Sequence, residues 1–267
     1  MKTNTLLAAA AILAVGGLAA QAQVYSQNVV GYYNVSVPAH GFALVGNQLQ
    51  NGSDTAQTNS SISTAFSGLA SDPNAVTNTT IYLFNNGTYA SYQYFTGADA
   101  DNNFLQSGSV NGFYDTGGNL ITTPLVQSAS AFLYNPFTGG AVTATVVGTV
   151  PQTTNVVAIH SGFNLLALPI PVSTNLESSV GGFVGTSDPN AVNNDVIFKF
   201  GVGGVWSSYQ FFTGSDADAN FLASGSVNGF YDTGGNLISS ALPVGQGFFI
   251  QHIVSGTEYW TNSFIVQ

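Results

Sequence analysis

Fifteen residues of this chain occur twice, letter for letter. The stretch SGSVNGFYDTGGNLI runs from Ser107 to Ile121 and returns from Ser224 to Ile238. Each copy holds an Asn-Gly pair and a Gly-Gly pair, which are typical of tight turns between β-strands. A fold that contains this stretch twice is constrained to hold two similar, turn-rich units.

Shorter matches extend the repeat. SDPNAV at 71–76 returns 116 residues later, and SYQYFTG at 91–97 returns as SYQFFTG after 117 residues. The change of offset indicates a one-residue insertion in a turn, where insertions are tolerated. Other matches are Gly41-Phe42 with Gly162-Phe163 and Ala131–Leu133 with Phe248–Ile250. We therefore predict two units, residues 23–150 and 151–267, from an internal duplication.

Each unit is predicted to consist mainly of strands. Aromatic and β-branched runs flank Asn85–Gly87 in the first unit and a Gly-rich turn at Gly201–Gly204 in the second, which predicts a β-hairpin in each. Inside the repeat, Asn111-Gly112 and Gly117–Asn119 predict two further turns. Apolar runs over 131–134 and 141–147 predict the last strands of the first unit.

Helical spacing occurs at one place in each unit. In the first, Ser60 or Ser61 is the expected cap of a short helix on the residues Ile62, Ala65, Phe66 and Leu69. In the second, the residues at this spacing are Leu176, Val180 and Phe183, although Gly181-Gly182 disfavours a helix there. We predict an all-β fold with minor short helices, made of two tandem, similar, sandwich or barrel-like units.

The charge balance excludes some partners. Twelve acidic residues face two lysines and no arginine. Nucleic acid is excluded as a partner, because binding it needs Lys and Arg to neutralise phosphates, and an anionic membrane surface is disfavoured for the same reason. Apolar residues make up 45% of the chain, so the low hydrophobicity typical of disorder is absent.

The first residues are typical of a secretory signal peptide. Lys2 precedes an apolar run from Leu6 to Ala20, and Ala20-Gln21-Ala22 has the pattern of a cleavage site, so we expect residues 1–22 to be removed. No later segment is long and apolar enough to predict a membrane span. The chain has no cysteine, which excludes disulfides and a lipid anchor on cysteine. We expect a secreted protein, extracellular or at the bacterial cell surface.

Four further segments carry a resemblance: Ser26–Tyr32, Val147–Gln152, Gly162–Leu166 and Pro243–Phe249. They are similar to segments of uncharacterised secreted β-rich repeat proteins of Verrucomicrobia-type bacteria. The resemblance covers most of the chain after residue 22 and implies export and a β-rich fold. It implies no activity and no functional residue.

The tripeptide Asp-Thr-Gly occurs once per unit, at Asp115 and Asp232. It resembles the loop of the aspartic proteases, in which two carboxylates about 3 Å apart share a proton and activate water. Gly118 and Gly235 stand where that family has Ser, Thr or Ala, and each Asp comes late in its unit. The alternative is a tight turn in which Asp accepts backbone N–H bonds.

An Asp-x-Asp-x-Asn pattern also occurs in both units. Its residues are Asp99, Asp101 and Asn103, and Asp216, Asp218 and Asn220. Oxygen ligands at positions 1, 3 and 5 match the start of a calcium-binding loop, but position 6 is Phe104 or Phe221 where glycine is required. These residues are therefore either calcium ligands or part of a capped helical turn, with Asp99 as the cap.

Aromatic residues and histidines offer fewer constraints. The aromatic residues with a sugar-stacking pattern are Tyr89, Tyr92 and Tyr94, with the matching Trp206, Tyr209 and Phe211. They fall on both faces of their strands, so some belong to the core. His40 and His160 align one position apart and His252 has no counterpart, so no zinc site is expected.

No set of residues predicts a catalytic site strongly. We expect a non-catalytic structural or adhesive protein of the extracellular space. It would act through extracellular polysaccharide, other surface proteins or self-association. A carbohydrate-binding module is the first alternative, and a duplicated aspartic-protease-like hydrolase is the second.

Overall fold

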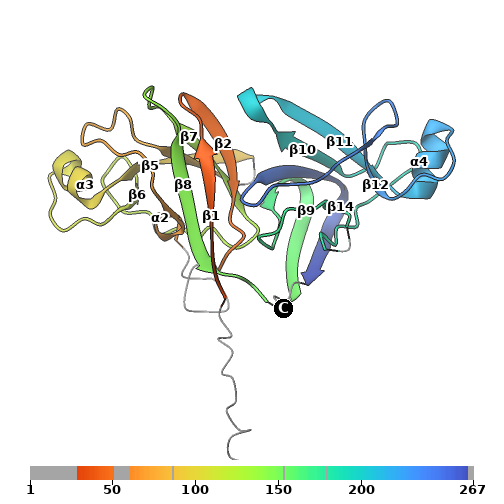
Figure 1. The fold of residues 1–267 in the computed structure, drawn as a ribbon, viewed down its shortest axis with the longest axis horizontal. Helices are drawn as coiled ribbons and strands as arrows, with labels where there is room; N and C mark the ends of the chain where they lie inside the picture. The colour runs from red at the N-terminus through yellow and green to blue at the C-terminus, as the bar shows by residue number, and fades with distance from the viewer. Residues whose placement is uncertain (1–28, 51–60, 86, 153, 179, 264–267) are drawn as a thin grey trace, which may run out of the picture.

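Strands dominate the computed structural model, which describes residues 29–50, 61–85, 87–152, 154–178 and 180–263. They form three antiparallel sheets, accompanied by short helices (Figure 1). The prediction of a mainly β fold is confirmed, and within the described ranges no sheet closes into a barrel. The predicted signal peptide, residues 1–22, and Ser60 lie outside those ranges.

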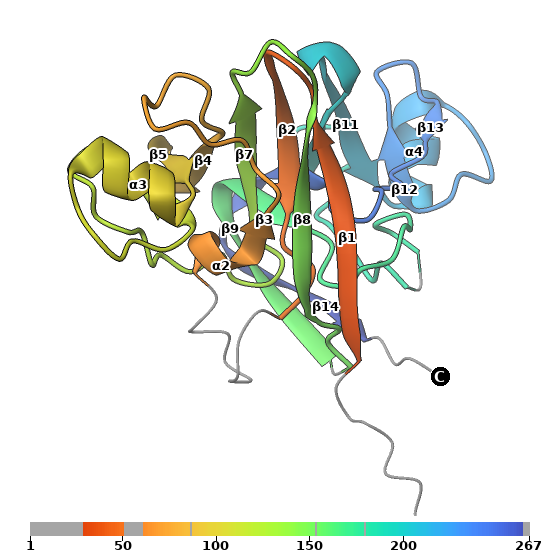
Figure 2. The same ribbon diagram turned by 60° about the vertical axis from the view of Figure 1, so that its left-hand side comes forward.

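The smallest sheet has the order β1–β8–β3 (Figure 2). Its strands are β1 (Val30–Val37), β8 (Val142–Thr149) and β3 (Phe66–Ser67). The helix predicted near Ile62 is confirmed over α2 (Ile62–Ala65), with Ser61 as its N-cap, but it ends earlier than its apolar spacing suggested. Phe66 is already extended, because it pairs with Val146 of β8.

The second sheet has the order β2–β7–β4–β5–β6. Its strands are β2 (Gly41–Gly46), β7 (Ser130–Asn135), β4 (Thr80–Asn85), β5 (Thr88–Phe95) and β6 (Gly112–Tyr114). The predicted hairpin around residues 85–87 is confirmed as β4 and β5. The helix α3 (Gly97–Phe104) follows β5 directly.

The third sheet has the order β13–β12–β11–β10–β14–β9. Its strands are β13 (Leu237–Ile238), β12 (Gly229–Tyr231), β11 (Trp206–Phe212), β10 (Val196–Phe200), β14 (Gly247–Ser263) and β9 (Thr154–Ala167). The predicted hairpin is confirmed as β10 and β11, joined through the 3-10 turn η1 (Val202–Gly204). The helix α4 (Gly214–Phe221) follows β11.

Long strands distinguish the third sheet from the second. β9 pairs with β14 from Thr154 to Ala167, and the register shifts where Ile253–Gly256 bulge out of β14. A bulge of this kind bends its strand and re-aims the side chains beyond it.

Two predicted local structures differ from the observed ones. Gly112 begins strand β6 instead of forming a turn, and a side chain there would clash with Ser63 and Leu120. The glycine is therefore required for close packing. Between Leu176 and Phe183 the described residues form turns and bends and no helix, and a Cβ added at Gly181 would lie 2.2 and 2.3 Å from the carbonyl oxygens of Asn175 and Leu176.

Each half of the chain has its own core, and a third cluster joins them. We call residues 29–152 the first half and 154–263 the second half. Phe113, Ile81 and Leu133 lie in the first core, and Phe230 and Ile250 in the second. The joining cluster contains the buried residues Leu44, Phe132, Leu165 and Phe249.

Backbone hydrogen bonds also connect the halves. The N–H of Gly46 donates to the carbonyl of Gly245 at 2.8 Å, and the N–H of Ala167 donates to the carbonyl of Ser128 at 2.8 Å. The N–H of Gly245 in turn has its own acceptor, the buried Gln48 Oε1 at 2.8 Å. The sequence left the relation of the halves open, and the structure shows them packed against each other.

The described chain ends meet at one pole of the molecule. Val30 pairs with Thr149, at the end of β8, and Thr154 pairs with Ser263, at the end of β14. Since only four residues separate Thr149 from Thr154, the first strand, the crossing between the halves and the last strand come together there (Figure 1).

Candidate functional site

The Asp-x-Asp-x-Asn segments form the helices α3 and α4. Thr96 is the N-cap of α3, and its hydroxyl accepts a hydrogen bond from the Asp99 N–H. Asp99 Oδ2 accepts from Thr96 Oγ1 at 2.7 Å and from Ser71 Oγ at 2.5 Å. Thr213, Asp216 and Ser187 repeat these contacts at α4. The predicted helical turn is confirmed, but its cap is Thr96, and Asp99 lies in the first turn.

The other residues of this pattern bind neighbouring backbone. Asp101 accepts from the N–H groups of Gly108 and Ser109, at 3.1 and 2.9 Å. Asn103 Nδ2 donates to the Pro73 carbonyl at 2.7 Å. Asp218 and Asn220 make the matching contacts. The carboxylates therefore hold the loop after each helix, and the calcium site on these residues stays a prediction.

Acid is expected to destabilise these loops. Hydrogen bonds from the hydroxyl and N–H of Ser109 lower the pKa of Asp101, and Ser226 lowers the pKa of Asp218 in the same way. A lowered folded-state pKa stabilises the fold above the unfolded value, about 3.9, and this contribution is lost as the pH falls through the folded value.

The measurement is the melting temperature between pH 2 and 7. The double variant Asp101→Asn/Asp218→Asn should melt a few degrees lower at pH 7 and lose less stability on acidification than the unmodified protein. Equal acid sensitivity of the two proteins would show that these carboxylates do not contribute.

Asp115 and Asp232 accept hydrogen bonds within their own turns. Asp115 Oδ1 accepts from the N–H groups of Gly117 and Asn119, both at 2.9 Å, and Asn119 Nδ2 contacts both carboxylate oxygens. Asp232 has the same partners in its turn. The amide and N–H of Asn119 lower the pKa of Asp115. The predicted turn at Gly117–Asn119 is confirmed.

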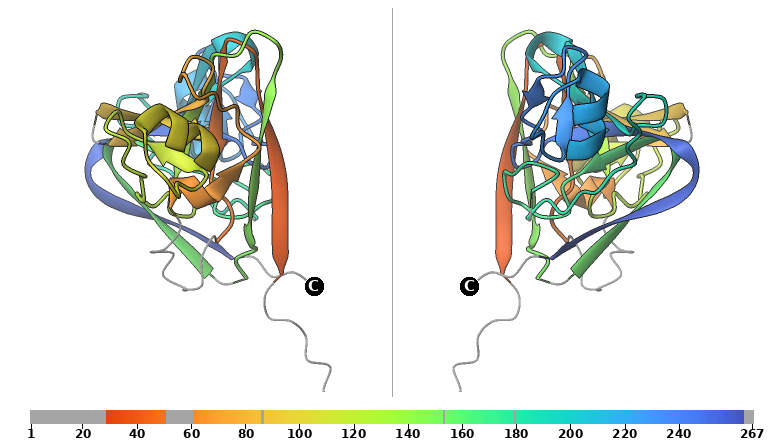
Figure 3. Two further views of the ribbon diagram at one scale, coloured as in Figure 1. Left: turned by 90° about the vertical axis from the view of Figure 1, so that its left-hand side faces the viewer. Right: turned by 90° about the vertical axis from the view of Figure 1, so that its right-hand side faces the viewer.

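The two Asp-Thr-Gly turns are not brought together. They follow β6 and β12, which lie at opposite ends of the molecule, beside α3 and α4 (Figure 1). Views from the two ends show α3 facing the viewer in one and α4 in the other (Figure 3). The shared-proton pair of an aspartic protease needs both carboxylates in one site, so this geometry offers no support for the hydrolase alternative.

Aromatic rings from both halves gather at their junction. We call this set the aromatic groove: Phe42, Tyr82, Phe84, Tyr89, Phe132, Phe163, Phe198, Phe200, Trp206 and Phe249. They line two hollows of about 370 and 390 Å³ that share Tyr89 and Trp206. Trp206 is 43% exposed and Tyr89 is 50% exposed. The two hollows therefore adjoin at the rings of Tyr89 and Trp206.

Ring contacts fix the walls of the aromatic groove. The Trp206 ring lies 5.0 Å from Phe200 and 5.6 Å from Phe249, between ring centroids. Tyr89 lies 5.2 Å from Phe84 and 6.2 Å from Phe132. Since each exposed ring rests on two less exposed ones, its orientation is set before any ligand binds.

The sequence predicted three sugar-stacking aromatic residues in each unit, and only the first of each three lines the aromatic groove. Tyr89 and Trp206 line the aromatic groove, whereas Tyr94 and Phe211 are buried in the two cores. Tyr92 and Tyr209 are half-buried and pack against the same cores.

A wider, more polar hollow continues the aromatic groove. Its volume is about 880 Å³, and it shares Phe42 and Phe200 with the groove. Polar side chains along it include Asn34, Ser36 and Gln246. Among the described residues, no Asp, Glu, Lys or Arg lines the groove or this hollow. The whole surface is therefore suited to an extended, uncharged ligand.

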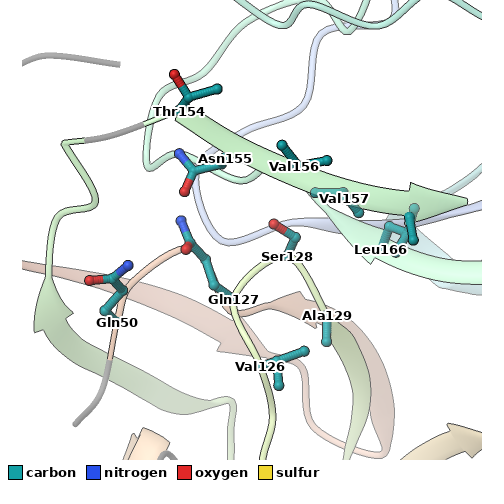
Figure 4. Close-up of a pocket in the computed structure, with 11 residues that line it drawn as sticks. Gln50, Val126, Gln127, Ser128, Ala129, Thr154, Asn155, Val156, Val157 and Leu166 are labelled. Carbon is teal, nitrogen blue, oxygen red and sulfur yellow. The ribbon is translucent and has the colours of Figure 1, made fainter. Parts of the chain in front are cut away.

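Another hollow, of about 440 Å³, lies between the start of β9 and the segment 126–129 (Figure 4). Its walls are amides, hydroxyls and aliphatic side chains, such as Gln50, Ser128 and Val157. None of its described lining residues is an acid, a base or a cysteine, so the lining holds no group that could activate the hydroxyl of Ser128 or Thr154 as a nucleophile.

A buried histidine has partners that the sequence did not reveal. His252 Nδ1 lies 2.7 Å from Asp195 Oδ1 and 3.9 Å from Glu258 Oε2. Asp195 and His252 are buried. Burial raises the pKa of Asp195, although the Thr186 N–H and His252 oppose this. Asp195 immediately precedes β10, and the bulge in β14 returns Glu258 towards His252.

A sequence signal for this cluster existed. Eight of the twelve acidic residues have an acidic counterpart in the other unit, but Asp195 and Glu258 do not. Asp195, Glu258 and His252 therefore have no counterparts of the same type in the first unit, and this difference between the units was visible in the sequence.

Comparisons with known proteins add no assignment. The chain matches no protein-family model, no curated protein and no solved structure.

Proposed function

We propose that the protein is a secreted, non-catalytic adhesive protein that binds extracellular polysaccharide in the aromatic groove. The observation that carries this proposal is the continuous, partly exposed row of aromatic rings at the junction of the halves. Carbohydrate-binding surfaces need flat apolar faces for the C–H side of sugar rings and amides or hydroxyls for their oxygens.

Both kinds of group are present. Trp206, Tyr89 and Phe42 supply exposed rings, and the adjoining hollow supplies the amides of Asn34 and Gln246. An exposed apolar patch of this kind marks an interaction site. The absence of charged residues among its described lining favours a neutral polymer over an ionic one.

Two further features support the proposed role outside the cell. Residues 1–22 have the pattern of a signal peptide, and the chain resembles secreted β-rich repeat proteins. In the described part of the chain, the structure contains no helix with the length and apolarity for crossing a membrane.

We also infer that the halves derive from an internal duplication. Five strands follow the same order in the second and third sheets. The cluster that joins the halves pairs sequence-matched residues, Leu44 with Leu165 and Phe132 with Phe249. A duplicated unit that packs on its copy generates a groove lined by both.

Retention on insoluble cellulose, chitin and xylan tests the proposal. Trp206→Ala and Tyr89→Ala should each weaken retention on the bound polymer about tenfold, because truncating a central aromatic anchor commonly costs over 1 kcal/mol. Tyr259→Ala is the matched control, since Tyr259 is 70% exposed and does not line the groove. Retention that is equal in all four proteins would contradict the proposal.

Tryptophan fluorescence gives a second readout. The chain has two tryptophans, of which Trp206 lines the groove and Trp260 is buried with its indole N–H donating to the Gly181 carbonyl at 2.7 Å. A soluble hexasaccharide of the retained polymer should change the emission of the unmodified protein but not that of Trp206→Phe.

If the aromatic groove instead mediates self-association of the protein, the same variants should give a different result. In that case Trp206→Ala would lower the sedimentation coefficient of the protein and leave retention on the polymers unchanged.

A further inference from the structure

The buried cluster of the second half has the composition of a metal site. One nitrogen of His252 and one carboxylate oxygen each of Asp195 and Glu258 lie within 4.8 Å of one another. Imidazole nitrogen and carboxylate oxygen are ligands of zinc, at about 2.0–2.2 Å, so neighbouring ligand atoms of a tetrahedral site are about 3.3 Å apart. The distances from His252 Nδ1, 2.7 and 3.9 Å, bracket that separation.

One threonine orients both carboxylates. The Thr186 N–H donates to Asp195 Oδ2 at 2.8 Å, and Thr186 Oγ1 donates to Glu258 Oε1 at 2.6 Å. Each carboxylate thus has one oxygen held by Thr186 and the other near His252. Outer hydrogen bonds that fix the ligands in this way are a regular feature of metal sites.

The first half folds without these groups. Thr79 and Asn135 occupy the positions that match Asp195 and His252. Thr79 Oγ1 accepts from the Ala70 N–H at 3.1 Å, much as Asp195 Oδ2 accepts from the Thr186 N–H. Asn135 Nδ2 donates to the Gly140 carbonyl at 3.0 Å. The strand arrangement therefore requires neither an acid nor a histidine at these places.

We propose that Asp195, His252 and Glu258 bind one divalent transition-metal ion, with Zn²⁺ as the best-fitting ion. His252 Nδ1, Asp195 Oδ1 and Glu258 Oε2 are the three protein ligands, and water completes the tetrahedron. Glu258 is 37% exposed and provides the entrance from solvent. The ion neutralises two carboxylates that face the same histidine, and one of them, Asp195, is fully buried and costly to bury without a cation.

The site stands apart from the proposed polysaccharide binding, since none of its three residues lines the aromatic groove. Its role is to fasten β14 to the start of β10 in the second half. Metal binding should therefore change the stability of the protein and leave polymer retention unchanged.

Titration of metal-stripped protein with ZnCl₂ tests the site. We expect one ion per chain by calorimetry, a melting temperature raised by several degrees, and visible absorption of a tetrahedral complex when CoCl₂ replaces ZnCl₂. CaCl₂ at the same concentration should leave the cobalt spectrum unchanged, which separates this site from the calcium prediction at α3 and α4.

Variants locate the ion. Asp195→Thr/His252→Asn installs the residues of the first half and should abolish both the cobalt spectrum and the shift in melting temperature. Glu258→Gln removes the exposed ligand and should weaken Zn²⁺ binding at least tenfold, so it serves even if the double variant folds poorly. Asp216→Asn is the control that keeps binding. Absence of stoichiometric Zn²⁺ binding, or its persistence in Glu258→Gln with unchanged affinity, would overturn the proposal.

Discussion

Phe230→Ala is expected to lower the free energy of unfolding by about 3–5 kcal/mol, the usual cost of removing a fully buried phenylalanine ring. Phe230 has no exposed surface, and its ring lies 5.7 Å from Phe183 and 5.5 Å from Phe211. Phe113 is the matched residue of the first half and is equally buried, with its ring 5.5 Å from Tyr94. Phe113→Ala should therefore have a similar effect.

The pair of variants also tests whether the halves unfold together. Both tryptophans lie in the second half, so tryptophan emission reports only that half, whereas far-ultraviolet circular dichroism reports both. Because the halves share a buried cluster and backbone hydrogen bonds, Phe113→Ala should shift both unfolding curves to the same lower denaturant concentration. A fluorescence transition that stays in place in Phe113→Ala would show that the halves unfold independently.

Gly46→Ala is expected to destabilise the junction by about 1–3 kcal/mol, the usual cost of an extra methyl group in a packed core. A Cβ added at Gly46 would lie 2.2 Å from the Cβ of Ala167, far inside contact distance. Ala167 is fully buried and belongs to β9 of the other half. The measurement is chemical unfolding followed by circular dichroism.

A compensating change provides the control. Gly46→Ala/Ala167→Gly exchanges the two residues and removes the clash, so it should recover most of the lost stability. A double-mutant cycle should therefore give a coupling energy of about 0.5–3 kcal/mol, as expected for residues in contact. If the double variant loses as much free energy of unfolding as the two single variants together, the contact between residues 46 and 167 does not limit packing at the junction.

Local features of the fold were predictable from the sequence, because their causes are local. The β4–β5 and β10–β11 hairpins follow from aromatic and β-branched runs around glycine turns. Asn111-Gly112 has an equally good turn pattern, yet the Asn111 side chain accepts a hydrogen bond from the Gly97 N–H at 2.8 Å and Gly112 continues as a strand. Its role depends on residues distant in sequence.

The candidate sites depend on such distant contacts. Tyr89 and Tyr94 are both aromatic residues of β5, yet Tyr94 is buried in the core of the first half and Tyr89 stays 50% exposed beside Phe132 of the joining cluster. His252 and Asp195 lie together because β14 pairs with β10. Glu258 lies near them because β14 bulges between His252 and Thr257, and no sequence pattern predicted this bulge. Neither the aromatic groove nor the buried cluster follows from residue spacing alone.

The meeting of the chain ends has a practical consequence for orientation on a surface. Phe249 of the aromatic groove pairs with Leu165, eleven residues along β9 from Thr154 and so about 35 Å along the strand at its usual rise. A tether attached near Ser263 is therefore remote from the groove along the strand, and Val30 lies at the same pole of the molecule. Immobilised through either end, the protein presents its aromatic rings to the solution in the same orientation.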